Sequence, residues 1–186
     1  DHAGDSVSET NANPASGGSD TVFTYLASHT LAANVENGRI LTAAAADLAG
    51  NGLGNLLQGG SGSNRLAGGL GNDTLAGGSG ADFFRFDSLP DATTNRDTIS
   101  DFSVLDDTIE LENAVFASLA SGPLAAGSFR SGAGFSSAAD ADDFLIYDSS
   151  SGALYYDAAG NTGAAAVQIA SLGSGLTLTS LDVVVT

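Results

Sequence analysis

Four nine-residue units follow one another without a gap from residue 50 to residue 85, and they constrain the fold more than any other feature of the chain. Their sequences are GNGLGNLLQ, GGSGSNRLA, GGLGNDTLA and GGSGADFFR. Each unit has an amide or carboxylate residue at its sixth place (Asn55, Asn64, Asp73, Asp82) and a large apolar residue at its eighth (Leu57, Leu66, Leu75, Phe84). A polar and an apolar period of nine therefore coincide.

The pattern of each unit predicts a glycine turn of about six residues followed by a short strand, because glycine adopts backbone angles that other residues resist. In such a strand only the middle residue faces the interior, so the eighth place is expected to be buried. Two units then form one coil of a flattened right-handed spiral. Sixth places two units apart lie one strand spacing apart, so Asn55 is expected to face Asp73, and Asn64 to face Asp82.

Side-chain oxygens paired in this way, together with backbone carbonyls of the turns, form an oxygen-only ligand set. Such a set favours a hard cation with flexible geometry, which indicates calcium rather than zinc or magnesium. The glycines at the second and fourth places belong to the predicted ligand turns, and they are Gly60, Gly62, Gly69, Gly71, Gly78 and Gly80.

The units GGLGNDTLA and GGSGADFFR resemble the GGxGxDxUx repeat of RTX proteins. This resemblance implies a calcium-binding parallel β-roll in a protein secreted by a type I system. The alternative is a flexible glycine-rich linker, but a linker has no reason to place a large apolar residue at every ninth position.

The composition excludes several other classes of function. Of the 186 residues, 22 are acidic and 5 are basic, which gives a net charge of −17. This charge argues against nucleic acid and anionic membrane surfaces as partners, since both need basic patches. Cysteine is absent, and no apolar run approaches the ~20 residues needed to span a bilayer. A first residue of Asp rather than Met indicates a fragment of a longer protein.

The period of nine also continues upstream of the units. Val22, Leu31 and Ile40 are nine residues apart, and Leu48 then comes one residue early. We therefore expect a roll over residues 15–90 with a one-residue deletion between Ile40 and Leu48. Residues 15–49 would be poor in metal and 50–90 would bind calcium. Residues 1–14 would be the remnant of a preceding repeat and a loop.

After Phe84 the period of nine gives way to alternation, and the order of the following segments resembles the region that closes the calcium spiral of serralysin-type proteins. In that family two aspartates flanking a loop supply the last metal site, and the resemblance places them at Asp91 and Asp97. The alternative is that both carboxylates are merely solvated.

The remainder, residues 91–186, is expected to be a mostly antiparallel cap. FLIYD (144–148) and ALYYD (153–157) predict a β-hairpin, and two strands are expected at AVQIAS and DVVVT. Asp182 followed by three valines at the C-terminus resembles the tail by which type I secretion machinery recognises its substrates. The alternative is a simple edge strand of the cap.

We predict no catalysis by this chain, because its two histidines, His2 and His29, have no partner pattern such as HExxH and its serines lack a GxSxG elbow. The prediction is an all-β, secreted or cell-surface, calcium-binding module, the C-terminal part of a larger exported protein. Two alternatives remain. One is a repeat module of an adhesin or S-layer protein that binds saccharide or neighbouring chains. The other is the non-catalytic module of a secreted protease, lipase or polysaccharide-modifying enzyme.

Overall fold

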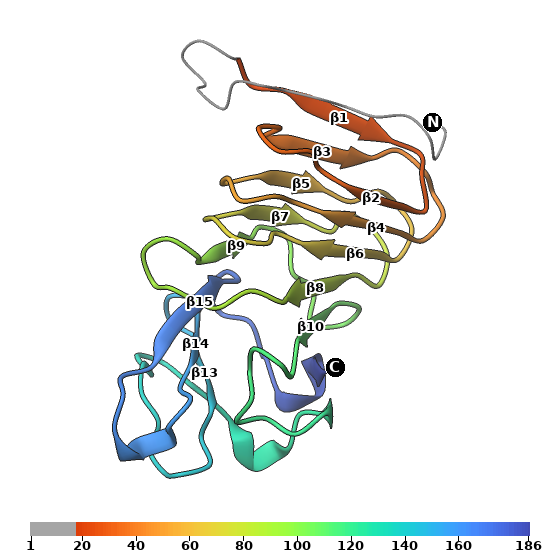
Figure 1. Cartoon of the computed structure of the whole chain (residues 1–186). Helices are drawn as coiled ribbons and strands as arrows, with labels where there is room; N and C mark the ends of the chain where they lie inside the picture. The colour runs from red at the N-terminus through yellow and green to blue at the C-terminus, as the bar shows by residue number, and fades with distance from the viewer. Residues whose placement is uncertain (1–17) are drawn as a thin grey trace.

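The computed structural model describes residues 18–186, and from β1 to β10 successive strands alternate between two sheets (Figure 1). One sheet has nine strands in the order β1-β3-β5-β7-β9-β15-β14-β13-β12. The other has seven, in the order β11-β16-β10-β8-β6-β4-β2. The remnant expected at residues 1–14 lies outside the described residues. No helix of the described residues is long and apolar enough to cross a membrane.

Ten strands build the roll, and they are short because each coil contributes only one or two inward side chains per sheet. They are β1 (Thr21–Thr24), β2 (Ser28–Thr30), β3 (Asn37–Ile40), β4 (Ala46–Ala49), β5 (Leu56–Gln58), β6 (Asn64–Ala67), β7 (Thr74–Ala76), β8 (Phe83–Phe86), β9 (Asp97–Ile99) and β10 (Thr108–Leu111). All of them pair in parallel with the strand of the same sheet one coil away. The predicted parallel β-roll is confirmed.

The eighth-place residues of the four units form two apolar columns inside the roll. Leu57 pairs with Leu75 in the nine-stranded sheet, and Leu66 pairs with Phe84 in the other. Each of these four side chains has a relative exposure of 0 %. Burying such a side chain contributes about 1.5–3 kcal/mol, so the columns stabilise the roll without any metal.

The register upstream differs from the expected period of nine. Val22 pairs with Gly38, and Gly38 pairs with Leu57, so Gly38 rather than Ile40 occupies the inward column. Leu31 fills the space that the missing side chain leaves, since a Cβ atom at Gly38 would lie 3.1 Å from its Cδ2. In the other sheet His29, not Leu31, pairs with Leu48. The expected deletion between Ile40 and Leu48 is therefore wrong.

Parallel pairing continues beyond residue 90 through β9 and β10, and in the seven-stranded sheet it extends to β16 (Val183–Val185), which pairs in parallel with β10. The rest of the cap consists of β11 (Gly122–Pro123), β12 (Phe129–Gly132), β13 (Leu145–Asp148), β14 (Ala153–Tyr156), β15 (Val167–Ser171) and the 3-10 turns Ala126–Ser128, Gly160–Thr162 and Ser180–Asp182. The hairpin β13–β14 is antiparallel, as predicted, and β14–β15 and β11–β16 are antiparallel too. The C-terminal strand is not at an edge, because it lies between β10 and β11.

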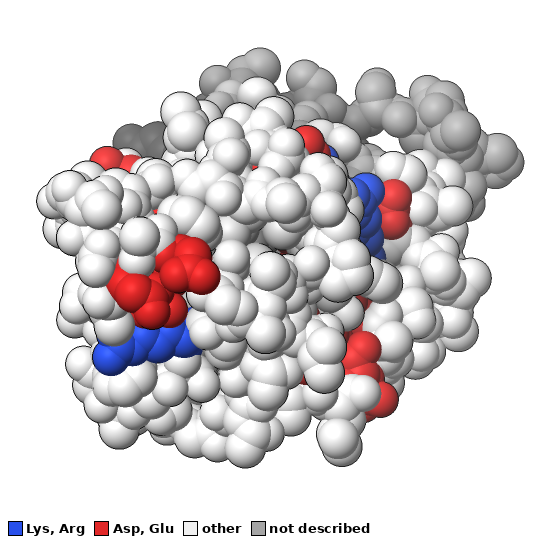
Figure 2. Space-filling model, turned by 90° about the horizontal axis from the view of Figure 1, so that it is seen from below, with Lys and Arg blue, Asp and Glu red and all other residues white. Residues whose placement is uncertain are grey.

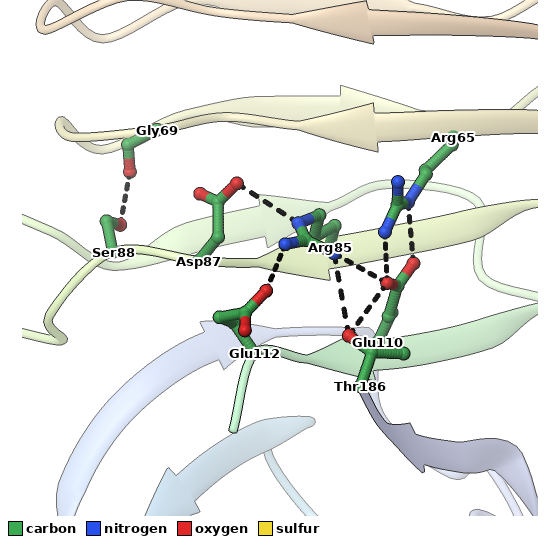
Figure 3. Close-up of polar contacts among 8 residues, drawn as sticks. All are labelled: Arg65, Gly69, Arg85, Asp87, Ser88, Glu110, Glu112 and Thr186. Atoms are coloured by element: carbon green, nitrogen blue, oxygen red, sulfur yellow. Dashed lines mark hydrogen bonds and ion pairs between the residues drawn. The ribbon is translucent and has the colours of Figure 1, made fainter. Parts of the chain in front are cut away.

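A polar network crosses the outer face of the seven-stranded sheet where the roll meets the last strand (Figure 3). Glu110 of β10 accepts hydrogen bonds from Arg65 of β6, Arg85 of β8 and the hydroxyl of Thr186, the last residue. Arg85 also pairs with Glu112 and Asp87. Glu110 is only 4 % exposed, so β6, β8 and the residue that follows β16 share one buried carboxylate of β10.

Candidate calcium-binding columns

The sixth-place residues stack in two polar columns, one beside each apolar column. The first column contains Asn55, Asp73 and Asp97, each directly before or at the start of strands β5, β7 and β9. In it, the backbone N–H of Asn55 donates to Oδ1 of Asp73 (2.7 Å), and the N–H of Asp73 donates to Oδ1 of Asp97 (3.0 Å). The predicted facing of Asn55 and Asp73 is therefore present.

The second column contains Asn64, Asp82 and Asp107 and repeats the same contact. The N–H of Asn64 donates to Oδ1 of Asp82 (2.7 Å), and the N–H of Asp82 donates to Oδ1 of Asp107 (3.0 Å). Asn64 and Asp82 thus face one another as expected. The column runs on to Asp107, which the sequence analysis did not single out.

The fit of these columns to calcium rests on two carboxylate oxygens. Asp73 and Asp82 are each 1 % exposed, and Oδ2 of each is buried without a hydrogen-bond partner. A buried anionic oxygen without a partner is costly, because it has lost water and gained nothing in return. A hard cation would supply the missing contact, so the donor set suits calcium.

The backbone around these two oxygens is shaped by glycine. Gly71 has a φ of 120° and Gly80 a φ of 124°, in the region that side chains disfavour. A Cβ atom at Gly71 would lie 2.3 Å from the carbonyl oxygen of Leu53 in the coil above. At Gly80 it would lie 2.7 Å from the carbonyl oxygen of Gly62. Carbonyl oxygens of the neighbouring coil therefore approach both turns so closely that only glycine fits there, and the role of these turns as ligands stays a prediction.

The two asparagine turns differ from the two aspartate turns. Oδ1 of Asn55 accepts the N–H of Asn51 (2.8 Å), and Oδ1 of Asn64 accepts the N–H of Gly60 (2.7 Å). The amide nitrogen of Asn55 donates to the carbonyl oxygens of Val35 and Glu36 in the coil above. Gly60 and Gly62 are not among the glycines with positive φ, whereas Gly69, Gly71, Gly78 and Gly80 are. The asparagine turns are thus closed by hydrogen bonds of their own.

Burial and mutual repulsion act on the carboxyl groups of both columns. Desolvation raises the pKa of Asp73, and desolvation followed by the negative charge of Asp73 raises the pKa of Asp97. Burial likewise raises the pKa of Asp82 and Asp107. In the absence of a cation these groups resist ionisation, and a bound divalent cation would remove that resistance.

The two aspartates expected to supply the last metal site have different environments. Asp97 lies in the first column next to Asp73, as described above. Asp91 is exposed, and its Oδ1 accepts hydrogen bonds from Thr93 (both its N–H and its hydroxyl) and from the N–H of Thr94. These bonds lower the pKa of Asp91. Its side chain therefore closes its own loop and forms no hydrogen bond with the first column, and its role as a ligand remains a prediction.

A sequence signal existed for Asp107, although it lies outside the nonapeptides. An aspartate followed by one residue and then a buried apolar residue occurs at Asp73-Thr-Leu, Asp82-Phe-Phe, Asp97-Thr-Ile and Asp107-Thr-Ile. Asp101 is a second residue that the sequence pattern did not indicate. Its two carboxylate oxygens accept the N–H groups of Gly77 and Gly78 (both 2.9 Å), so its side chain stabilises the start of the fourth unit's turn.

Comparison with known proteins agrees with this geometry. Residues 50–84 match the RTX calcium-binding nonapeptide repeat family, in four copies. No curated protein sequence matches the chain. The matched residues contain Asn55, Asn64, Asp73 and Asp82 and the glycine turns that carbonyl oxygens of the neighbouring coils approach. Residues 50–84 are thus RTX-type repeats, and calcium is the ion that this repeat family binds.

Proposed function

We propose that this chain is a module that folds when it binds calcium after export by a type I system, as part of a larger exported protein. The calcium-binding role follows from the repeats, and its coupling to folding and export is the proposal. The observation that carries it is the pair of buried, unpartnered oxygens at Asp73 and Asp82. Without metal these oxygens destabilise the stacked coils, and with metal they bind the ion and stabilise the stack.

The affinity expected of such sites fits a switch between compartments. Extracellular calcium modules bind with dissociation constants of about 0.1–1 mM, far above cytosolic calcium. A site at 100 times its dissociation constant contributes about 2.7 kcal/mol, so two or three sites would supply a large part of a typical domain's stability. The residues that would hold the ions are the carboxylates of Asp73, Asp82, Asp97 and Asp107, with carbonyl oxygens of the turns.

The C-terminal tail supports folding after export rather than before it. Val183 and Val185 are both 2 % exposed, and Asp182 caps a 3-10 turn through Thr179. A secretion machine could therefore read this tail only in a chain that has not yet folded. An extracellular or cell-surface location follows from the same proposal.

We further propose that the module is not an enzyme. Ser28 and His29 are consecutive residues of β2, so their side chains point to opposite faces of the sheet and cannot act as nucleophile and base. An assay of the purified chain that detects hydrolase activity would contradict this part of the proposal.

The partners of the module are expected to be calcium and the secretion machinery rather than nucleic acid or anionic membrane. On the face seen in Figure 2 the basic side chains lie against acidic ones and form no patch of their own. A saccharide partner would favour a row of exposed aromatic residues along the roll. Phe23 and Tyr25 lie close together at β1, whereas Phe83 lies on β8 of the other sheet, so in the described part of the roll these exposed aromatics form no row along it.

The experiment compares thermal unfolding by circular dichroism in chelator and in millimolar calcium, with calorimetric calcium titration of the same protein. We expect a large calcium-dependent rise in the midpoint that is reduced in Asp73→Asn and Asp82→Asn. Asp47→Asn is the matched control, because Asp47 is exposed on β4 and belongs to neither column. Equal midpoints in chelator and calcium would show that calcium does not drive folding.

A further inference from the structure

Two acidic residues outside the matched repeats continue the first column upstream. Asp20 directly precedes β1 and Glu36 directly precedes β3, as Asn55 precedes β5. The ladder that follows them is continuous, since Thr21 pairs with Asn37 and Asn37 pairs with Leu56. Asp20 and Glu36 therefore hold the position in their coils that Asp73 and Asp97 hold further down.

Asp20 and Glu36 make the same kind of contact that connects adjacent coils in the calcium repeats. The N–H of Asp20 donates to Oε2 of Glu36 at 2.9 Å, just as the N–H of Asn55 donates to the carboxylate of Asp73. The other carboxylate oxygen of each residue, Oδ2 of Asp20 and Oε1 of Glu36, is buried and has no hydrogen-bond partner. Asp73 and Asp82 are the only other described carboxylates with such an oxygen.

We propose that Asp20 and Glu36 form an additional calcium site in the upstream coils, where the repeat signature is absent. The inference rests on the proposed calcium-binding role of the columns. Two carboxylates from adjacent coils with buried, unpartnered oxygens repel one another unless a cation lies between them. Oxygen-only donors suit calcium here for the same reason as in the repeats. The coils expected to be poor in metal thus contain a site of their own.

This upstream site is separated from the repeat sites by Asn55. The amide nitrogen of Asn55 donates to the backbone carbonyl of Glu36, so the junction between these two coils is already closed by hydrogen bonds. The column is therefore interrupted, and the ion at Asp20 and Glu36 binds independently of the ions at Asp73 and Asp82. Calcium binding at the repeats therefore does not determine calcium binding at the upstream site.

The test counts calcium ions by native mass spectrometry in wild type and in Glu36→Gln, at a calcium concentration that saturates the wild type. Glutamine keeps an oxygen that can accept the N–H of Asp20, so the fold is expected to persist by circular dichroism. We expect one ion fewer per chain, whereas the Asp47→Asn control binds the wild-type number. Asp20→Asn is the second variant, and whichever variant keeps its spectrum decides the outcome.

An unchanged ion count in the decisive variant overturns the upstream site. The double variant Asp73→Asn/Asp82→Asn separates this failure from failure of the proposed function. If the double variant loses ions and the upstream variant loses none, the repeats bind calcium and the upstream site does not exist. If neither loses ions, both proposals fail. A calcium titration followed by NMR gives an independent readout, since the amide signal of Asp20 should shift in wild type and stay fixed in Glu36→Gln.

Discussion

Replacing Glu110 by glutamine tests how firmly the last strand is held to the roll. The Glu110 carboxylate accepts the Nε–H of Arg65 at 2.7 Å, a second N–H of the same guanidinium, an N–H of Arg85 at 2.7 Å and the hydroxyl of Thr186 at 3.0 Å. Burial alone would raise the pKa of Glu110, but the hydrogen bonds from Arg65 and Thr186 outweigh it and lower the pKa. The charged form is therefore the one that stabilises the fold.

The expected loss follows from the burial of the two partners. Removing one charge of a fully buried ion pair costs about 3–5 kcal/mol. The Arg65 side chain is 38 % exposed, so water takes over part of what it loses. Glutamine also keeps one acceptor oxygen. We therefore expect a loss of about 2–3 kcal/mol in the free energy of unfolding, which is about 4–12 °C in midpoint for a chain of this size.

The assay is urea unfolding in saturating calcium, so that the metal sites contribute equally to both proteins. Glu112→Gln is the control, because the Glu112 carboxylate pairs with Arg85 alone among the described residues and its side chain is 29 % exposed. The control should lose about 0–1 kcal/mol. The difference between wild type and Glu110→Gln should shrink as the pH falls below about 4, since a lowered pKa gives stability that is lost on protonation. Equal losses in the two variants would refute the reasoning.

Three further perturbations test the columns. Asn55→Asp should raise the calcium affinity measured by calorimetry, because a charged oxygen replaces an amide oxygen. In chelator the same variant should lose about 1–3 kcal/mol in the free energy of unfolding, because two hydrogen bonds of the amide nitrogen are lost. Leu66→Ala should cost about 2–5 kcal/mol in urea unfolding with or without calcium, against a much smaller loss for the 39 % exposed Leu56→Ala; equal losses would contradict the burial argument. In chelator, the free energy of unfolding should fall as the pH rises from about 4, because the pKa values of Asp73 and Asp97 are raised in the folded state and ionisation removes the stability they give. In calcium the free energy of unfolding should instead rise with pH, because the ion binds the ionised carboxylates. Thermal melts across pH, in chelator and in calcium, check both signs.

The repeats could be read from the sequence because each unit encodes its own geometry. The eighth place is large and apolar in all four units, and the structure buries each of these side chains completely. Upstream this link between spacing and position is broken. Val22 and its partner Gly38 are 16 residues apart, whereas Gly38 and Leu57 are 19 apart. A coil of varying length has no fixed period, so spacing alone placed Leu31 and Ile40 in columns that they do not occupy.

The polar columns were predicted in part for a related reason. Asp73 and Asp82 follow glycine turns of constant length, whereas Asp107 follows a loop without that signature. Glu36 was harder still to find, because glutamate is not the repeat residue and its coil is irregular. Its position becomes visible only when the ladder through Thr21, Asn37 and Leu56 is traced in three dimensions.

The position of the last strand gives the proposed export route a structural consequence. Val183 and Val185 lie between β10 and β11, so the seven-stranded sheet of the roll is complete at its lower end only when the C-terminal residues are in place. In tail-first export these residues reach the outside before any coil of the roll. The cap and β10 can then assemble with Glu110 bonded to Thr186, and present the parallel edge of β10 to β8. Arg85 and Arg65 complete the contacts of Glu110 when β8 and β6 arrive. Each coil that emerges afterwards can pair with a strand that is already formed, while calcium neutralises the charge of the acidic column between them. Folding outside would accordingly proceed from the C-terminus toward the N-terminus, with the upstream coils last.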